Sequence, residues 1–239
     1  DIGSLAASLW YRGIAHILIP TSLLAMTDAA IGGKTAINFN HNKNLVGSFY
    51  LPKKIIIDIY FLKTLSKDEY RQGLAEIFKH GIGLNEQLLE MLEKSEGIVT
   101  REILEESIKT KVQIVEQDFN EKGIRKLLNF GHTIGHAIEI NHNIKHGDAV
   151  AIGMLLETQI SHLTGHTPNQ VAEKIKNILI QHFPVNAYRL DKKKIIDSLR
   201  YDKKKENKYL HIPVIEKIGR SSLVKFEISE YINLLNKVL

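Results

Sequence analysis

A change in the spacing of apolar residues at Ser66 constrains the fold most strongly. From Ser66 onward, apolar residues recur at helical intervals, whereas the preceding residues lack this pattern. Ser66 and Glu69 form a capping box, which predicts a helix that extends to about Gly83. Thr100 has the character of a second helix start. Further helices are expected over residues 125–139, 147–164, 169–182 and 191–200 and from Ser229, with a strand pair over Tyr209–Val214 and Ser222–Phe226.

The residues before Ser66 have the pattern of mixed structure. Ile14–Ile19 and Lys54–Ile59 are short apolar runs adjoining prolines, which is typical of buried strands. The segment between them is rich in Gly and Asn and predicts a long functional loop that could hold a short hairpin. We therefore expect an α/β fragment over residues 1–65, followed by a mainly α-helical domain over residues 66–239.

The composition limits the possible chemistry. Hydrophobic residues make up 44% of the 239 positions and charged residues 25%, a globular balance that argues against disorder and coiled coil. The absence of Cys excludes disulfides, thiolate metal sites and cysteine nucleophiles, so any metal must be held by Asp, Glu or the 11 His. No apolar run is long enough to predict a membrane span, and the first ten residues do not form a secretory signal. The net charge of +5 suits a small anionic substrate as well as a polyanion.

Two histidines with flanking glycines form the strongest motif. His132 and His136 are four residues apart, so on a helix they share one face, where they could bind a metal or meet a substrate. Gly131 and Gly135 precede them and would let another helix or a ligand approach closely. A single histidine in a helix is more often a core residue, but the pair with its glycines favours a functional site.

Two further segments add potential ligands. His146 is a third histidine at an expected helix start, and Glu76 lies in an unusually apolar stretch, with Lys79 on the same helical face. Glu76 and Lys79 are either a surface ion pair or side chains that project into a site. One carboxylate with two imidazoles is typical of a catalytic zinc site that keeps a position open.

A glycine-rich segment indicates an anion site of another kind. Gly32-Gly33-Lys34-Thr35 has the end of a phosphate-binding loop, but Asp28 stands where the first glycine of a P-loop belongs, which disfavours a P-loop nucleotidase. A flexible backbone beside a lysine and a hydroxyl group can still bind a phosphate or a carboxylate. Cations and an amide concentrated around the Gly and His motifs support this reading: Lys43, Asn44, Lys111 and Arg125.

A set of segments, taken in order along the chain, carries a family resemblance: YRGIAHILIPTS, MTDAAIGGKTAIN, KNLVGSF, FLKTLS, GLAEIFKHG, RKLLNFGHTIGHAIE, HGDAV and DKK. Together they resemble the 3-dehydroquinate synthase family, and the resemblance covers essentially the whole chain. It implies that Glu76, His132 and His146 are ligands of a divalent metal, zinc or cobalt. It implies an NAD site lined by Asp1, Thr21, Ser22, Phe61, Leu62, Lys63, Thr64 and Leu65, with Ser22 replacing a usual Thr, and by Lys34 and Lys43 of the loop.

The resemblance also implies substrate-binding residues. Lys79 would lie beside the reacting hydroxyls, His136 near the phosphate, and Arg12 would reach the site of a neighbouring subunit in a homodimer. The groups expected to hold the substrate carboxylate are Lys111, Arg125 and Asn129. The groups expected to contact phosphate are Lys34, Asn44 and either Lys203 or Lys204.

The implied reaction belongs to the shikimate pathway of aromatic amino acid biosynthesis. The substrate would be 3-deoxy-D-arabino-heptulosonate 7-phosphate, and the products 3-dehydroquinate and phosphate. NAD would oxidise the C5 alcohol, the metal would polarise its oxygen, phosphate would leave, and NADH would return the hydride before ring opening and aldol closure. We expect a cytoplasmic enzyme with no nucleic-acid or membrane partner.

One feature departs from the family pattern. Members carry an N-terminal dinucleotide-binding domain of about a hundred residues that ends in a glycine-rich turn, and this sequence begins at the Asp that follows such a turn. We therefore expect a fragment or a truncated protein that binds NAD weakly and is inactive alone.

Other readings remain open at this point. Another sugar-phosphate cyclase, such as 2-deoxy-scyllo-inosose synthase, would share the metal and NAD chemistry but would not need a carboxylate-binding set. A metal-dependent polyol dehydrogenase would not need Lys34, Lys43 and Asn44. A helical scaffold protein would bind no stoichiometric metal. Lys192–Lys194 and Lys203–Lys205 could support a nucleic-acid reading, but they lack the interleaved aromatic residues.

Overall fold

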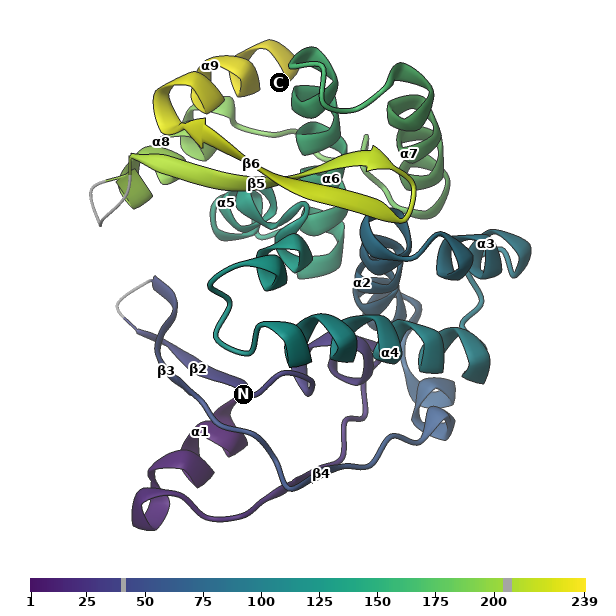
Figure 1. The fold of residues 1–239 in the computed structure, drawn as a ribbon, viewed down its shortest axis with the longest axis vertical. Helices are drawn as coiled ribbons and strands as arrows, with labels where there is room; N and C mark the ends of the chain where they lie inside the picture. Colours follow the sequence, from purple (N-terminus) through teal and green to yellow (C-terminus); the bar gives the residue numbers. More distant parts are fainter. Residues whose placement is uncertain (40–41, 204–207) are drawn as a thin grey trace.

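The computed structural model describes residues 1–39, 42–203 and 208–239. Figure 1 shows the N-terminal elements at the bottom of the molecule, the C-terminal hairpin and its surrounding helices at the top, and α2 and α4 between them. The expected order of an α/β fragment followed by a mainly helical part is confirmed.

The N-terminal fragment holds two small sheets. Strands β1 and β4 pair in parallel, and β2 and β3 form an antiparallel hairpin that is longer than expected. Only two residues of each predicted strand pair, Ile17–Leu18 with Lys54–Ile55, and the remaining residues of both runs lie outside the ladder. The elements are α1 (Ile2–Leu9), η1 (Trp10–Arg12), β1 (Ile17–Leu18), η2 (Ala25–Ala29), β2 (Lys34–Phe39), β3 (Asn42–Phe49), β4 (Lys54–Ile55) and η3 (Ile59–Thr64).

The remaining elements pack around one apolar core, in which Phe78, Ile134 and Val150 are fully buried. Among the described residues, no helix is both long enough and apolar enough to cross a membrane. The elements are α2 (Lys67–Leu84), α3 (Glu86–Lys94), α4 (Arg101–Gln117), η4 (Ile124–Asn129), α5 (His132–His142), α6 (His146–Leu163), α7 (Asn169–His182), α8 (Lys192–Lys203), β5 (Tyr209–Lys217), β6 (Arg220–Glu227) and α9 (Ile228–Val238).

The predicted helix starts at Ser66 and Thr100 are confirmed. The Ser66 side chain accepts a hydrogen bond from the Glu69 amide at 3.2 Å, and the Thr100 side chain accepts one from Ile103. Sequence analysis missed α3, which begins directly after α2. Asn85 ends one helix and caps the next, because its side chain accepts the Leu88 amide at 3.1 Å.

The helix predicted over residues 125–139 is wrong as a single element. Residues Ile124–Asn129 form the 3₁₀ helix η4, and α5 begins at His132 after a sharp break. Gly131 has a φ of +79°, a left-handed conformation that interrupts helical hydrogen bonding and that glycine adopts without strain. The break redirects the chain so that His132 stands in the first turn of a new helix.

Helices α5 and α6 cross at very close range through three glycines. A Cβ atom on Gly153 of α6 would overlap the carbonyl oxygen of Gly131, and one on Gly135 would lie 3.0 Å from the Ala149 carbonyl oxygen. The expectation that small residues here admit a neighbouring helix is therefore confirmed. The crossing brings His146, the first residue of α6, beside His132, the first residue of α5.

A buried carboxylate strengthens the same contact. Glu157 of α6 accepts the backbone amide of Gly131 at 2.7 Å and that of Ile134 at 3.3 Å. Burial raises the pKa of Glu157 to about 8, although these backbone amides act to lower it. Because the first amides of a helix have no partner within the helix, Glu157 caps α5 from outside.

We expect Gly153→Ala to lower the free energy of unfolding by about 2 kcal/mol or more, because its methyl group would force α5 and α6 apart. Urea denaturation followed by circular dichroism measures the change. Gly83→Ala is the matched control, since its Cβ would meet nothing closer than 3.8 Å and its helix propensity would rise. Equal stability of the two variants would contradict the close crossing.

The buried His80 predicts a dependence of stability on pH. Its Nδ1 atom contacts Ser107 Oγ at 2.9 Å, and burial lowers its pKa to about 3. The unfolded chain therefore binds this proton more readily, so stability falls as pH drops below about 6.5. We expect the loss of unfolding free energy between pH 7 and pH 5 to be smaller in His80→Gln by about 2 kcal/mol. Denaturation curves at both pH values test this, and parallel losses would contradict it.

Candidate active site

A cleft of about 840 Å³ lies between the N-terminal fragment and the helical part. Elements that are distant in sequence contribute to its walls, among them α2, α4, α5 and the β2–β3 hairpin. Its ionisable and polar lining residues are Asp1, Asp28, Lys34, Asn38, Asn44, Lys79, Lys111, Arg125, Asn129, His132, His136 and His146.

Glu76 is a fully buried carboxylate beside this cleft. Helix α2 buries one long run of its residues, and Glu76 lies in that run, where it forms an ion pair with Lys79 one turn later. Its Oε1 atom lies 3.1 Å from His146 Nε2 and 3.6 Å from His132 Nε2. A ligand atom from each of these three residues lies within 4.8 Å of the other two.

Both imidazole rings are oriented for metal binding. His132 Nδ1 donates to the carbonyl oxygen of Phe130, and His146 Nδ1 donates to Glu139 Oε2, each at 3.2 Å. Because Nδ1 of each ring donates a hydrogen bond, Nε2 of both rings is left to face Glu76. One carboxylate and two imidazoles fixed in this way fit a divalent ion such as zinc, with room for ligands from the cleft.

Burial and the neighbouring charges shift the pKa values of these groups. Burial acts to raise the pKa of Glu76, but Lys79 and the two histidines hold it well below its usual range. Burial acts to lower the pKa of His146, but Glu139 and Glu76 raise it to about 9. The pKa of His132 falls to about 3 through burial and the nearby Lys79 ammonium. At pH 7 Glu76 is therefore ionised and His132 neutral, as metal binding requires, whereas a cation would have to displace a proton from His146.

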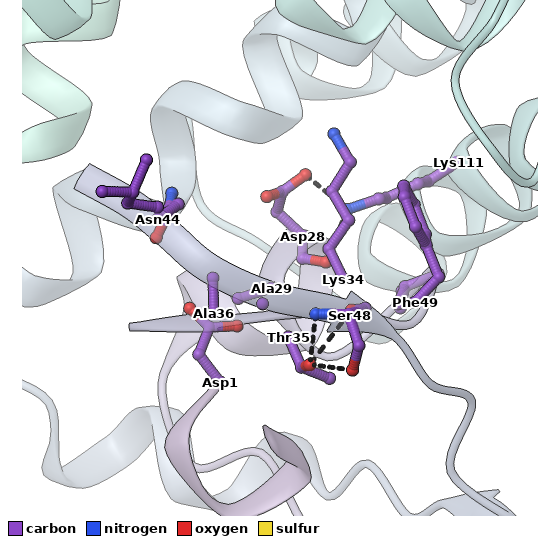
Figure 2. A pocket seen from close by; sticks show the side chains of 13 residues that line it. Asp1, Asp28, Ala29, Lys34, Thr35, Ala36, Asn44, Ser48, Phe49 and Lys111 are labelled. Atoms are coloured by element: carbon purple, nitrogen blue, oxygen red, sulfur yellow. Dashed lines mark hydrogen bonds and ion pairs between the residues drawn. The ribbon is translucent and has the colours of Figure 1, made fainter. Parts of the chain in front are cut away.

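Asp28 forms a second acidic centre that sequence analysis passed over. Lys111 Nζ donates to Asp28 Oδ1 at 2.5 Å, and Lys79 Nζ lies 4.0 Å from the same oxygen. Burial acts to raise the pKa of Asp28, but the two ammonium groups hold it well below its usual range. Figure 2 shows Asp28 and Lys111 in the part of the cleft that also holds Lys34 and Asn44. The sequence gives no signal for the hydrogen bond between Asp28 and Lys111, because the two residues are 83 positions apart and only the fold brings them together.

Arg125 is buried and holds two parts of the cleft wall together. Its guanidinium donates to the carbonyl oxygen of Gly32 at 2.9 Å and to that of Phe119 at 2.5 Å. Burial lowers its pKa, against nearby carboxylates that raise it. The guanidinium thus fixes the glycine turn that precedes Lys34 in a defined place.

Glu121, which sequence analysis missed, contacts two residues that line the cleft. It forms an ion pair with Lys34 of the β2–β3 hairpin and accepts a hydrogen bond from Asn129 Nδ2 at 2.7 Å. These contacts join the hairpin to η4 across the cleft. Glu121 lies in a turn between two predicted helices, and only its position four residues before Arg125 hinted at the site.

The structure brings together part of the predicted set. The residues that line the cleft with His132 and His146 are Asp1, Lys34, Asn44, Lys79, Lys111, Arg125, Asn129 and His136, and Glu76 is buried beside the cleft. Residues of the predicted NAD set that do not line it are Thr21, Ser22, Phe61, Leu62, Lys63, Thr64 and Leu65.

The remaining predicted residues lie either away from the cleft or outside the described part of the chain. Arg12 is exposed after α1 and does not line it. The side chain of Lys43 and the whole of Lys204 lie outside the described residues, so their predicted roles stay predictions. The side chain of Lys203, the alternative to Lys204, likewise lies outside them.

Comparison with known proteins connects this geometry to one family. Residues 1–72 match the family described as 3-dehydroquinate synthase N-terminal, and residues 73–205 match 3-dehydroquinate synthase C-terminal. The chain is 39% identical over 237 residues to the 3-dehydroquinate synthase of Dictyoglomus turgidum, covering 94% of this chain and 66% of that protein. It is 41% identical over 229 residues to that of Helicobacter pylori, covering 94% and 67%. The chain thus spans about two thirds of the length of these relatives.

Solved structures show the same fold in related cyclases. A 2-epi-5-epi-valiolone synthase from Streptomyces hygroscopicus, with NAD⁺ and Zn²⁺ bound, superimposes with a TM-score of 0.85 at 27% identity, over 100% of this chain and 70% of that one. A 2-deoxy-scyllo-inosose synthase complexed with carbaglucose-6-phosphate, NAD⁺ and Co²⁺ gives 0.86 at 25% identity, over 100% and 71%. With family matches that together extend from residue 1 to residue 205, the chain belongs to the 3-dehydroquinate synthase family.

Proposed function

We propose that this chain carries the metal-binding and substrate-binding part of a 3-dehydroquinate synthase. The reaction converts 3-deoxy-D-arabino-heptulosonate 7-phosphate to 3-dehydroquinate and phosphate in the shikimate pathway. The observation that carries the proposal is the convergence of Glu76, His132 and His146 beside a cleft lined by lysines. Relatives at about 40% identity that are 3-dehydroquinate synthases support it.

A metal at Glu76, His132 and His146 would supply Lewis-acid polarisation of a substrate hydroxyl, and NAD would supply reversible hydride transfer at that carbon. The NAD⁺, Zn²⁺ and Co²⁺ in the related cyclases support both cofactors. The carboxylate-and-imidazole donor set independently favours zinc or cobalt.

The buried lysines would act as fixed positive charges. Burial acts to lower the pKa of Lys79, but Glu76 and Asp28 raise it, so its ammonium stays protonated through the reaction. Lys79 would therefore donate hydrogen bonds to substrate hydroxyls rather than remove their protons. Burial lowers the pKa of Lys111, although Asp28 acts to raise it. Lys111 would hold the substrate carboxylate together with Asn129. Arg125 would contribute by fixing the cleft wall, since its guanidinium donates to two backbone carbonyls.

The phosphate would bind to other residues that line the same cleft. Lys34 and Asn44 of the hairpin and His136 of α5 all line the cleft and can donate hydrogen bonds to an anionic oxygen. Held there, the departing phosphate could itself accept the proton from the adjacent carbon, and the cationic groups would orient it. Lys34 would exchange its ion pair with Glu121 for the phosphate.

Assembly and location extend the same proposal. We assign Arg12 to the site of a neighbouring subunit in a homodimer, which its exposed position after α1 permits. The proposed substrate is a small phosphorylated sugar acid, and we expect no nucleic-acid or membrane partner. We expect the enzyme to be cytoplasmic.

A related sugar-phosphate cyclase is the second candidate, favoured by the close superposition on 2-deoxy-scyllo-inosose synthase. A substrate without a carboxylate would leave Lys111 and Asn129 with no anionic partner from the ligand. The carboxylated substrate uses them and is therefore the first choice.

We expect the purified chain to retain about one equivalent of Zn²⁺ or Co²⁺, held by Glu76 and two imidazoles. Glu76→Ala or His132→Ala should weaken binding by more than about 100-fold, because each removes a direct ligand. Isothermal titration and metal analysis provide the measurement. His166→Ala, whose ring contacts Thr164 outside the cleft, should bind metal normally. Unchanged binding in both site variants would refute the metal site.

We expect Lys111→Met to weaken binding of the carboxylated sugar phosphate by about tenfold or more, since it removes a buried cation. Binding is measured by titration of the metal-loaded chain with 3-deoxy-D-arabino-heptulosonate 7-phosphate and with glucose 6-phosphate. Phosphate release in the presence of NAD⁺ then tests turnover. Preference for glucose 6-phosphate, with no effect of the substitution, would instead favour the second candidate.

A further inference from the structure

The imidazole of His146 lies between two different groups of ligand atoms. Its Nε2 atom lies 3.1 Å from Glu76 Oε1, within the metal site proposed above. Its Nδ1 atom lies 3.2 Å from Glu139 Oε2 on the other side of the ring. The two nitrogens of one ring can therefore serve two separate centres.

The second group has a donor set of its own. His136, Glu139 and His146 each offer one ligand atom, and these atoms all lie within 4.8 Å of one another. His136 and Glu139 are three residues apart on α5, so they present their side chains from one helical face, and His146 begins α6 opposite them. Two imidazoles and one carboxylate are again a combination that suits a zinc-like ion.

The second group is also accessible. His136 and His146 line the cleft, and the side chains of Glu139 and His146 are 18% and 25% exposed, whereas Glu76 is fully buried. An ion there could keep water ligands and exchange with solvent without opening the core. We therefore expect weaker binding than at the Glu76 site.

We propose that His136, Glu139 and His146 form a second divalent-cation site, and that its occupancy inhibits the enzyme. The inhibitory part rests on the proposed function, because His136 is there assigned to the substrate phosphate. A cation bound through His146 Nδ1 takes the place of the proton now shared with Glu139, and that proton passes to solvent. No other bond is made or broken besides metal–ligand bonds.

The other role open to Glu139 is purely positional. As an acceptor for Nδ1, its carboxylate orients His146 toward Glu76 without binding any ion. Glu139→Gln separates the two roles, because the amide oxygen still accepts from Nδ1 while an amide is a poor zinc ligand. Glu173→Gln is the matched control, at a half-exposed glutamate of α7 that pairs with Lys176.

The experiment titrates the metal-free chain with Zn²⁺ alone and counts binding steps by calorimetry, with Co²⁺ absorption as a second readout. We expect the wild type and Glu173→Gln to bind two equivalents, the second at least about tenfold more weakly. Glu139→Gln should keep the first step and lose the second. His132→Ala should weaken the first step most. Where phosphate release is measurable, excess Zn²⁺ should inhibit the wild type but not Glu139→Gln.

Three results would overturn the second site. These are a wild type that binds a single equivalent, a Glu139→Gln variant that still binds two, and a Glu139→Gln variant that loses the first step, which assigns Glu139 a positional role alone. A failure of the proposed function looks different. In that case the tight first step is missing from the wild type, whatever residue stands at position 139.

Discussion

The close crossing of α5 and α6 is the contact on which the site depends. Gly153 admits the carbonyl of Gly131 at a distance that no side chain would allow, and Glu157 of the same helix caps α5. The first residues of both helices are histidines, so a contact between backbones sets the separation of two imidazoles. Because backbone atoms hold this spacing, it does not rely on the rotamer of a long side chain.

Charge compensation explains how so many ionised groups are buried together. Glu76 and Asp28 supply two negative charges, and Lys79 and Lys111 supply two positive ones within short contact. An unpaired charge at this depth would cost several kcal/mol, whereas the paired set is close to neutral. A divalent ion at Glu76 would then give the cleft a net positive charge, which would match the carboxylate and phosphate of the proposed substrate. The overall excess of five positive charges acts in the same direction.

The sequence predicted elements whose signals are local. The Ser66 capping box, the Thr100 start, the helix over 169–182 and the C-terminal strand pair depend on residues a few positions apart, and all are present. The continuous helix through Gly131 was wrong because its apolar spacing continues across the break, and the left-handed glycine is stabilised by contacts with α6. Likewise, β1 and β4 pair over only two residues although both apolar runs are longer.

The metal ligands could be proposed from residue types, but their partners could not. Asp28 and Glu121 are ordinary acidic residues in the sequence, and each becomes part of the site through an ion pair with a lysine more than 80 positions away. The same holds for Glu139, which joins the proposed second site only because α6 places His146 against it. The two nitrogens of His146 face Glu139 and Glu76, so binding of an ion at one nitrogen affects binding at the other. A cation at Nδ1 would have to displace the proton that His146 shares with Glu139, so the second ion should bind less tightly than the first.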